Sequence, residues 1–223
     1  MSLYHDVESI NTIVNLYGLN HYFSYFTEWN TSWLAPYHNG YHSLCMLLNC
    51  TEAAYHERLT GSETRALLVA ALFHDFNHSA GKYPDQNNIA QALVDLQKAH
   101  SLASHNLLAL SKEEIELAIR CIQVTKYPYE QRPEVLVEKI IRDADLMQPY
   151  EENPGRLLQQ YLGLKHEIEV LHQRSYTDEE FAEGNDKFLG DVEWHTGWAI
   201  EKARVRGWDG VRANLRKILL ERN

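Results

Sequence analysis

Histidines and aspartates gather in three short segments of the sequence, each next to apolar residues. The first segment reads YHNGYH, the second HDFNH and the third RDADL. Together they contain seven groups that can hold a proton or a metal ion: His38, His42, His74, Asp75, His78, Asp143 and Asp145. Because burying a charged group costs free energy unless it is paired, either these groups satisfy one another in a core or a metal ion satisfies them.

A divalent metal ion suits these residue types. Neutral imidazole nitrogen and carboxylate oxygen are ligands of hard and borderline divalent ions, and catalytic sites of this kind keep positions open for water and substrate. The order is histidine, then histidine–aspartate, then aspartate, on three separate predicted helices. The sequence therefore predicts a metal site with nitrogen and oxygen ligands. Ligands carried on helices have the rigidity that a catalytic site needs.

Helical spacing predicts which of these groups lie together. His38 and His42 are four residues apart, so on one helix both would lie on the same face, about one turn from each other. The second segment repeats this spacing. Asp143 and Asp145 would lie about 200° apart around a helix, so only one of them can face a metal ion. Asp145 stands between alanine and leucine and is predicted to face inward, whereas Asp143 is predicted to hold a neighbour or to face solvent.

The remaining histidines and the cysteines show no such pattern. Six histidines are predicted to be ordinary core or surface residues: His5, His21, His56, His166, His172 and His195. The cysteines are odd in number and lack a CxxC pair, which argues against a disulfide framework and against a cysteine zinc site.

The elements that must position these groups are predicted to be helices. Few segments alternate apolar and polar residues, whereas apolar residues recur at helical spacing along most of the chain. Ser62, Ser111 with Glu114, and Pro133 are predicted to begin three helices. Helices are expected over residues 7–17, 21–29, 37–56, 63–73, 85–100, 114–125, 134–147, 156–174, 178–206 and 210–221. The prediction is one all-α domain, residues 1–223, with a core over about 34–150 and a C-terminal helical extension over 154–223.

Composition narrows the class of protein. The chain has 223 residues, of which 44% are hydrophobic, and this is enough for a sizeable core. A net charge of −10 argues against binding of a nucleic-acid duplex, which normally needs a basic face. The longest apolar run has eight residues, too few for a membrane span, and no signal peptide opens the chain. A cytoplasmic protein is therefore expected.

With these motifs the chain resembles the HD superfamily of metal-dependent phosphohydrolases, which are all-α. Cyclic nucleotide phosphodiesterases carry YHN-x-x-H, then HD-x-x-H followed by small residues and glycine, then A-D-L; this chain has YHNGYH, HDFNHSAG and ADL. A group of small bacterial predicted HD phosphohydrolases carries YHN-x-x-H, FHD, N-E-x-x-S-A and ADL. That group is also similar in length and in the segment FLGDVEW. The resemblance spans about residues 34–205 and implies the HD helical bundle with a metal at its centre.

Residue by residue, the resemblance implies roles for six side chains. It makes His42, His74, Asp75 and Asp145 the metal ligands. It implies that His38 protonates the leaving oxygen, and that His78 lies near a second metal ion and its bridging water. The implied cofactor is one or two divalent ions per chain, with Mn, Mg, Fe, Co, Ni and Zn all open.

The implied reaction is hydrolysis of a phosphate ester, and the implied substrate is a nucleotide. A metal-bound water would attack, and Asp75 or Asp145 could accept its proton. Lys82 and Lys126 are candidate contacts to the phosphate by charge and position. A homo-oligomer is compatible with the sequence.

Two other functions stay open on the same fold. Diiron HD proteins, some of them oxygenases, need two further histidines before the last aspartate, and His100 and His105 lie in that interval. These two point about 140° apart on a continuous helix, and Thr125 stands where a later histidine would be expected. A non-catalytic nucleotide sensor is the other alternative. Asn88 stands where the bacterial group has glutamate, which weakens any role of that position in activating water.

Overall fold

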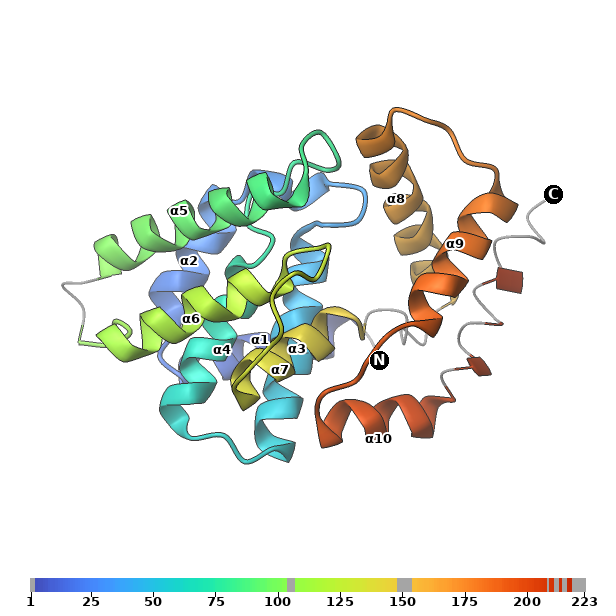
Figure 1. Ribbon diagram of the computed structural model, residues 1–223. Coiled ribbons are helices and arrows are strands. Elements are labelled where there is room, and N and C mark those ends of the chain that lie inside the picture. The colour runs from blue at the N-terminus through green and yellow to red at the C-terminus, as the bar shows by residue number, and fades with distance from the viewer. Residues whose placement is uncertain are drawn as a thin grey trace.

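The computed structural model describes residues 3–103, 107–147, 154–207, 209–210, 213 and 216–217 (Figure 1). The predicted all-α class is confirmed, because these residues form helices and no strand. The helices in this part of the chain are α1 (Leu3–Leu16), α2 (Asn20–Trp29), the 3₁₀ turn η1 (Thr31–Leu34), α3 (Gly40–His56), α4 (Gly61–Phe73), α5 (Asp85–Ala103), α6 (Lys112–Thr125), α7 (Leu136–Asp145), α8 (Pro154–His172), α9 (Asp178–Gly190) and α10 (Gly197–Arg206).

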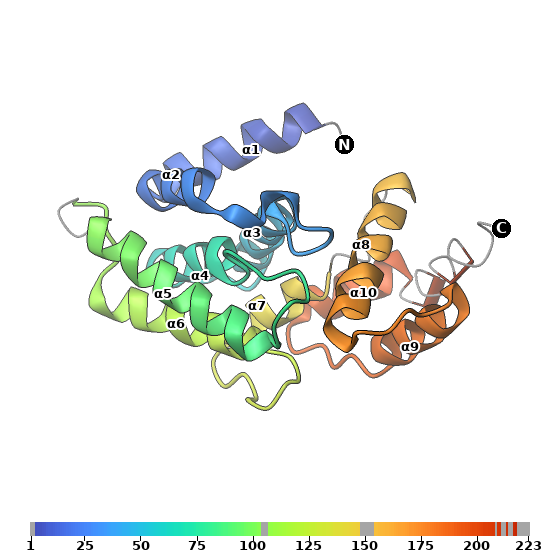
Figure 2. The same cartoon turned by 90° about the horizontal axis from the view of Figure 1, so that it is seen from above.

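The apolar helix α4 lies inside a bundle formed by α1–α7 (Figures 1 and 2). It packs against α2, α3, α5, α6 and α7. Residues 66–73 are fully buried on every side of the helix. A helix that is apolar all round must be surrounded by other elements, so the run ALLVAALF places its own C-terminal end in the interior. That end carries the HD dipeptide.

The start of α3 differs from the prediction and changes the position of one candidate residue. Asn39 has an extended backbone, and its side chain accepts a hydrogen bond from the backbone N–H of His42, so the helix begins at Gly40. Asparagine is among the best residues for this capping role. His38 therefore lies in the loop before the helix, and the prediction that His38 and His42 share one helix face is wrong.

Two other predicted helix starts are wrong, and one is confirmed. Thr60 caps α4 in a capping box, and Ser62 lies inside the helix, where its hydroxyl donates to Glu114. Pro133 lies ahead of α7, which begins after Val135. The box of Ser111 and Glu114 at the start of α6 is present as predicted.

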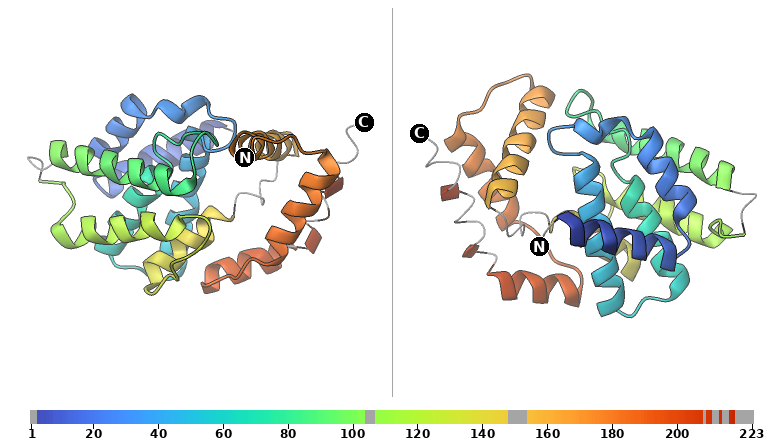
Figure 3. Two further views of the ribbon diagram at one scale, coloured as in Figure 1. Left: turned by 45° about the horizontal axis from the view of Figure 1, so that its top comes forward. Right: turned by 180° about the vertical axis from the view of Figure 1, so that it is seen from behind.

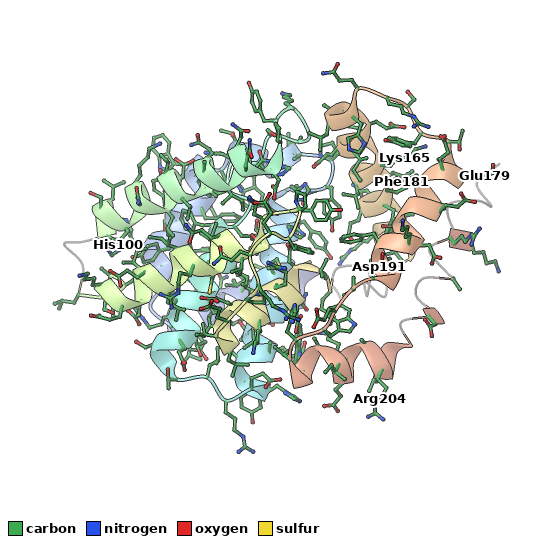
Figure 4. The ribbon with its side chains drawn as sticks, in the orientation of Figure 1. His100, Lys165, Glu179, Phe181, Asp191 and Arg204 are labelled. Carbon is green, nitrogen blue, oxygen red and sulfur yellow. The ribbon has the colours of Figure 1, made fainter. Side chains whose placement is uncertain are left out.

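The C-terminal helices stand together on one side of the bundle (Figure 3). Helices α8 and α9 form a hairpin with a small apolar cluster of its own, which includes Leu157, Tyr161, Phe181, Ala182 and Leu189. In Figure 4, Lys165 and Phe181 mark the two arms of this hairpin. Near its turn, the Lys165 ammonium donates to the Asp178 carboxylate at 2.6 Å.

The predicted continuous helix over 178–206 is wrong, because the chain breaks between α9 and α10. In this break the backbone N–H groups of His195 and Thr196 donate to the buried carboxylate of Asp143 on α7, at 2.8–3.1 Å. The Thr196 hydroxyl donates to the same carboxylate at 2.7 Å. Asp143 therefore anchors the start of α10 on the bundle. The predicted last helix, 210–221, falls largely outside the described residues.

Among the described residues, no helix combines the length and the apolar character that a membrane span requires.

Candidate metal centre

Four side chains converge on one point: His42 from α3, His74 and Asp75 from the turn after α4, and Asp145 from the end of α7. The Nε2 atoms of His42 and His74 are 3.0 Å apart. The Asp75 Oδ2 atom lies 3.1 and 3.0 Å from them, and the Asp145 Oδ1 atom lies 3.2 and 3.6 Å from them. Ligand atoms that surround one ion at about 2.1 Å are themselves about 3.0–3.4 Å apart. The four atoms are thus spaced as ligands of a single ion would be.

The polar atoms of this cluster also fit a cation. The Asp75 Oδ2 atom is buried and has no hydrogen-bond partner, a costly state for a carboxylate oxygen. His74 Nδ1 lies 2.9 Å from the backbone carbonyl of Ala71, and that carbonyl can only accept. The ring proton therefore sits on Nδ1, which leaves the lone pair of Nε2 directed into the cluster. This residue set fits a divalent metal ion.

The charges of the cluster also favour binding of a cation. Burial by itself would lower the pKa of His42, but the nearby carboxylates of Asp145 and Asp75, 3.2 and 3.1 Å from Nε2, outweigh burial and raise this pKa to about 9. The pKa of His74 is likewise raised well above its ordinary value, against burial, by the negative charge of Asp75. Burial would raise the pKa of Asp75, yet the charges of His74 and His38 hold it well below its usual range. The two carboxylates thus attract positive charge, which a metal ion can supply in place of protons.

The loop that carries the HD motif is strained and tightly held. Asn77 and Ala80 have φ angles of 58° and 54°, in the left-handed region that side chains other than glycine rarely adopt. The Asn77 carboxamide oxygen accepts from the backbone N–H of Thr31 at 2.6 Å, and its amide donates to Asp95 at 2.9 Å. Such strain is concentrated at functional sites, where the surrounding structure enforces it. Because α4 ends at Phe73, His74 and His78 do not share a helix face, contrary to the spacing prediction.

A second cluster lies beside the first and consists of His38, His78 and Glu167. The rings of His38 and His78 are in contact, with centroids 3.9 Å apart and planes tilted by 36°. The His38 Nδ1 atom is 2.5 Å from Oε2 of Glu167. Burial lowers the pKa of His78 to about 3, so this ring is neutral at pH 7. Asn88 contributes its amide, 2.8 Å from His78 Nε2, and does not substitute for a carboxylate.

Glu167 is a residue that the motif analysis missed. It lies on α8, outside all three motifs, and its side chain is 3% exposed. Spacing within one helix cannot predict its contact with the HD segment, because Glu167 lies on a different element and the contact forms only when the chain folds. In the sequence it is one of two glutamates in the mixed segment HEIEV, and such a segment is too common to identify a site.

The structure separates the two aspartates of RDADL as the helix geometry predicts. Asp145 joins the four-residue cluster, and Asp143 points away to the start of α10. Asp143 is fully buried, so it holds a neighbour and does not face solvent.

The two candidate lysines lie outside both clusters. Lys126 forms an ion pair with Glu130 at 2.5 Å. Lys82 is exposed, on the turn that follows the HD loop. The role of Lys82 and Lys126 in holding phosphate stays a prediction.

Neither cluster contains any of the other described histidine side chains. His100 bonds the Tyr22 hydroxyl at 2.8 Å, at the end of α5 remote from the C-terminal helices (Figure 4). His105 lies outside the described residues, and Thr125 donates to the Ile122 carbonyl. His100 therefore does not lie where it could bind a metal ion together with the cluster residues. His21, His56, His166, His172 and His195 are also outside both clusters, and the side chain of His5 is not described.

Two cavities lie where the bundle meets α8 and α9. The first is lined by Asp145 and by Tyr37, Leu146, Gln160, Tyr161, Leu164, Asn185, Phe188 and Leu189. The second has a volume of about 770 Å³ and is lined by residues that include Tyr127, Tyr129, Arg142 and Lys187. They share Leu146 and Phe188, so they adjoin. The cavity that Asp145 lines has a volume of only about 40 Å³, so the space for an organic group is the larger cavity that adjoins it.

Exchange of each aspartate for asparagine is expected to separate metal binding from stability. Asp145→Asn should lose most bound metal and turnover. Asp143→Asn should keep the metal but lower the free energy of unfolding by about 1–3 kcal/mol, because an amide cannot accept all the bonds from His195 and Thr196. Metal analysis and urea denaturation of both variants check this. Equal metal loss, or the reverse order, would show that the ligand is assigned to the wrong aspartate.

Metal addition to chelator-treated protein is expected to raise its melting temperature. At an ion concentration 100 times Kd, binding stabilises the fold by about 2.7 kcal/mol, which is roughly 5–10 °C for a chain of this size. The effect should be larger at pH 8 than at pH 6, because the ion must displace protons from His42 and His74, whose pKa values are raised. Differential scanning fluorimetry with Mn, Mg, Fe, Co, Ni and Zn tests it. Failure of all six ions to shift the transition would argue against a metal centre.

Comparison with known proteins places the fold. No protein-family model matches the chain, and no curated protein sequence matches it significantly. Among solved structures, the chain is similar to the phosphodiesterase domain of the RhoPDE fusion protein from the choanoflagellate Salpingoeca rosetta. The match has a TM-score of 0.62 and 17% sequence identity, and it covers 97% of this chain and 87% of that chain. The similarity shows that the two chains share a fold.

Proposed function

We propose that this protein is a metal-dependent hydrolase of phosphate esters, of the HD type, with a nucleotide as its substrate. The observation that carries the proposal is the buried cluster of His42, His74, Asp75 and Asp145, in which the Asp75 Oδ2 atom has no hydrogen-bond partner and could accept a cation. His38 lies next to this cluster, with its ring 5.8 Å from that of His42. The shared fold with a phosphodiesterase domain supports the same reaction class.

The four cluster residues would hold the metal ion. Such an ion lowers the pKa of a bound water and neutralises charge that develops on the phosphoryl group. The carboxylates of Asp75 and Asp145 are the groups within reach to take the proton that the attacking water gives up. Both have pKa values below their usual range, so both are ionised at neutral pH.

His38 would supply a proton to the departing oxygen. Water adds to phosphorus, the bond from phosphorus to the ester oxygen breaks, and that oxygen takes the proton from the imidazole. His78, whose neutral ring contacts the ring of His38, would border the attacking water. The organic part of the ester would occupy the cavities beside Asp145, where Tyr37 and Phe188 line the wall. Lys82 and Lys126 are retained as candidate phosphate contacts.

The experiment that tests this function is a matrix of substrates and ions. Chelator-treated protein is reloaded separately with each of the six metals and offered nucleoside monophosphates, cyclic nucleotides, dinucleotides and p-nitrophenyl esters. We expect hydrolysis of at least one ester, dependent on added metal and absent in His74→Ala. Absence of hydrolysis across the matrix, in protein that binds metal stoichiometrically, would overturn the catalytic proposal in favour of a sensor.

A further inference from the structure

Arg142 is a buried cation without a counter-ion in the part of the chain that the structure describes. It lies on α7, and only 4% of its surface is exposed. Its Nε atom donates to the Val124 carbonyl at 2.5 Å, and its Nη2 atom donates to the Gln131 carbonyl at 2.9 Å. No described carboxylate lies within ion-pair distance of the guanidinium. Carbonyl oxygens accept hydrogen bonds but carry no net charge, so the charge of Arg142 stays uncompensated, and buried arginines are normally paired.

The two aspartates that are nearest to Arg142 along α7 are engaged elsewhere. Asp143 accepts from the backbone N–H and the hydroxyl of Thr196. Asp145 faces the four-residue cluster, where a metal ion would take up its charge. Burial lowers the pKa of Arg142, and the charges of Tyr129 and of both aspartates offset burial only in part. Because arginine stays protonated in proteins, its environment favours an anion that comes from solution.

The guanidinium lies on the wall of the larger cavity. This cavity has a volume of about 770 Å³, which is the size of a site for an organic ligand. Lys187 on α9 lines the same cavity, and no described carboxylate pairs with it. Leu146 and Phe188 line both this cavity and the smaller one at Asp145. Two cations without counter-ions therefore face a space that leads to the proposed metal centre.

The acidic side chains on the wall of this cavity do not cancel these charges. Glu130 pairs with Lys126 at 2.5 Å, and Glu193 pairs with Arg132 at 3.2 Å. Asp191 is the remaining acidic residue of the described lining, and it is exposed where α9 ends (Figure 4). The unpaired charge of the wall is therefore net positive, although the whole chain has a net charge of −10. Such a site attracts an anion.

Aromatic rings fix the orientation of the guanidinium and form the apolar part of the wall. The guanidinium carbon of Arg142 lies 3.9 Å from the centre of the Tyr129 ring. The Tyr127 ring packs against Tyr129 and Phe188, with centroids 5.4 and 5.7 Å apart. A stacked guanidinium is a planar fork whose donors match the oxygens of a phosphate. The wall thus combines an oriented cation for phosphate with aromatic faces for a base.

A purely structural role for Arg142 would be to hold the loop that follows α6. That role accounts for the bonds to Val124 and Gln131. A guanidinium has five N–H donors, and no described residue accepts from Nη1. The structural role therefore explains neither the free donors nor the uncompensated charge.

We propose that Arg142, assisted by Lys187, binds a second phosphate group of the substrate, distinct from the phosphate whose ester bond is hydrolysed. The inference rests on the proposed function for the word substrate, whereas the anion site itself does not depend on it. It narrows the substrate class from nucleotides in general to nucleotides with two separate phosphate groups.

The kinetic test compares a nucleoside 3′,5′-bisphosphate with the corresponding 3′- and 5′-monophosphates, in protein loaded with the most effective ion. We expect kcat/KM to be about 10–100-fold higher for the bisphosphate, because hydrogen bonds between ionised groups are the strong ones. This ratio should fall about 10-fold or more in Arg142→Gln. The ratio is the readout because a loss of fold or metal lowers all the rates together. Equal kcat/KM values in the parent protein would overturn the second-phosphate role and leave the hydrolase proposal intact.

A binding test without turnover uses chelator-treated protein. Without metal, the carboxylates of the cluster repel phosphate, so Arg142 is the site left for it. Calorimetric titration with a nucleoside 5′-monophosphate should give a Kd about 10-fold or more below that of the unphosphorylated nucleoside. Arg142→Gln and Lys187→Gln should reduce this preference. The control is Lys112→Gln, which changes an 81% exposed side chain at the end of α6 remote from the cavity.

Lys187→Gln keeps the test decisive if Arg142→Gln fails to fold, because Lys187 is exposed and has no described ion pair to lose. Equal binding of nucleotide and nucleoside by the parent protein would overturn the anion site, and so would a preference that survives in every folded variant of Arg142 and Lys187. A preference that depends on these residues, in a protein that hydrolyses nothing, would leave the anion site standing and remove only the proposed function.

Discussion

His74→Ala and Asp75→Ala are each expected to abolish metal retention and turnover while leaving most of the helicity. Each substitution removes one of the four proposed ligands and leaves buried charges of the others unpaired. The helices themselves are held by the apolar core around α4, in which residues 66–73 are fully buried, so secondary structure should persist. Elemental analysis of dialysed protein and far-UV circular dichroism measure the two effects.

The matched control for this prediction is His172→Ala. That histidine is exposed, and its Nδ1 atom lies 2.7 Å from the hydroxyl of Tyr176 in its own hairpin, outside both clusters. It should keep both metal and turnover. Stoichiometric metal in His74→Ala and Asp75→Ala would disprove the assigned centre, however the activity changed.

His38→Ala is expected to keep the metal and lose turnover. Its ring lies outside the four-residue cluster, so removal leaves all four ligand atoms in place. A general acid typically contributes about 10²–10⁴-fold to the rate, and the loss should lie in kcat on an ester with a poor leaving group. On a p-nitrophenyl ester, which departs without a proton, the loss should shrink.

Two results would contradict the role of His38 as proton donor, and each would indicate a different role. If the variant strips the metal, His38 is a ligand and the second cluster of His38, His78 and Glu167 holds an ion after all. If the loss is the same on good and poor leaving groups, His38 positions the substrate. The proton donor would then be sought elsewhere, with His78 the next candidate.

The sequence indicated the helical class and the convergence of the ligand set because both follow from local chemistry. A run as apolar as ALLVAALF can only be surrounded, and a helix of that kind brings its terminal His74 and Asp75 into the interior. The angle between Asp143 and Asp145 follows from helix geometry alone, and Asp145 is the one at the cluster. These inferences needed no knowledge of distant contacts.

Other features could not be inferred because they depend on tertiary contacts or on competing caps. His38 lies before the helix because the Asn39 side chain accepts a hydrogen bond from the N–H of His42 and so caps the helix start. The break before α10 arises from a buried carboxylate on α7, more than 50 residues away along the chain, which has no mark in the local pattern. Glu167 on α8 lies 2.5 Å from His38 across more than 120 residues of chain, and α8 packs so closely there that a Cβ atom at Gly163 would come 2.1 Å from the carbonyl oxygen of Pro36. Spacing rules apply within a single helix, whereas these features depend on capping or on contacts between separate elements.

The measurement that tests the central claim most directly is phosphate-ester hydrolysis as a function of bound metal. Chelator-treated protein is titrated with the most effective ion, and metal content and rate are recorded on the same samples. We expect the rate to rise in proportion to occupancy and to saturate at one or two equivalents per chain, and we expect Asp145→Asn to bind little metal and to stay inactive. A rate that does not change with metal content, or that persists in Asp145→Asn, would contradict the account.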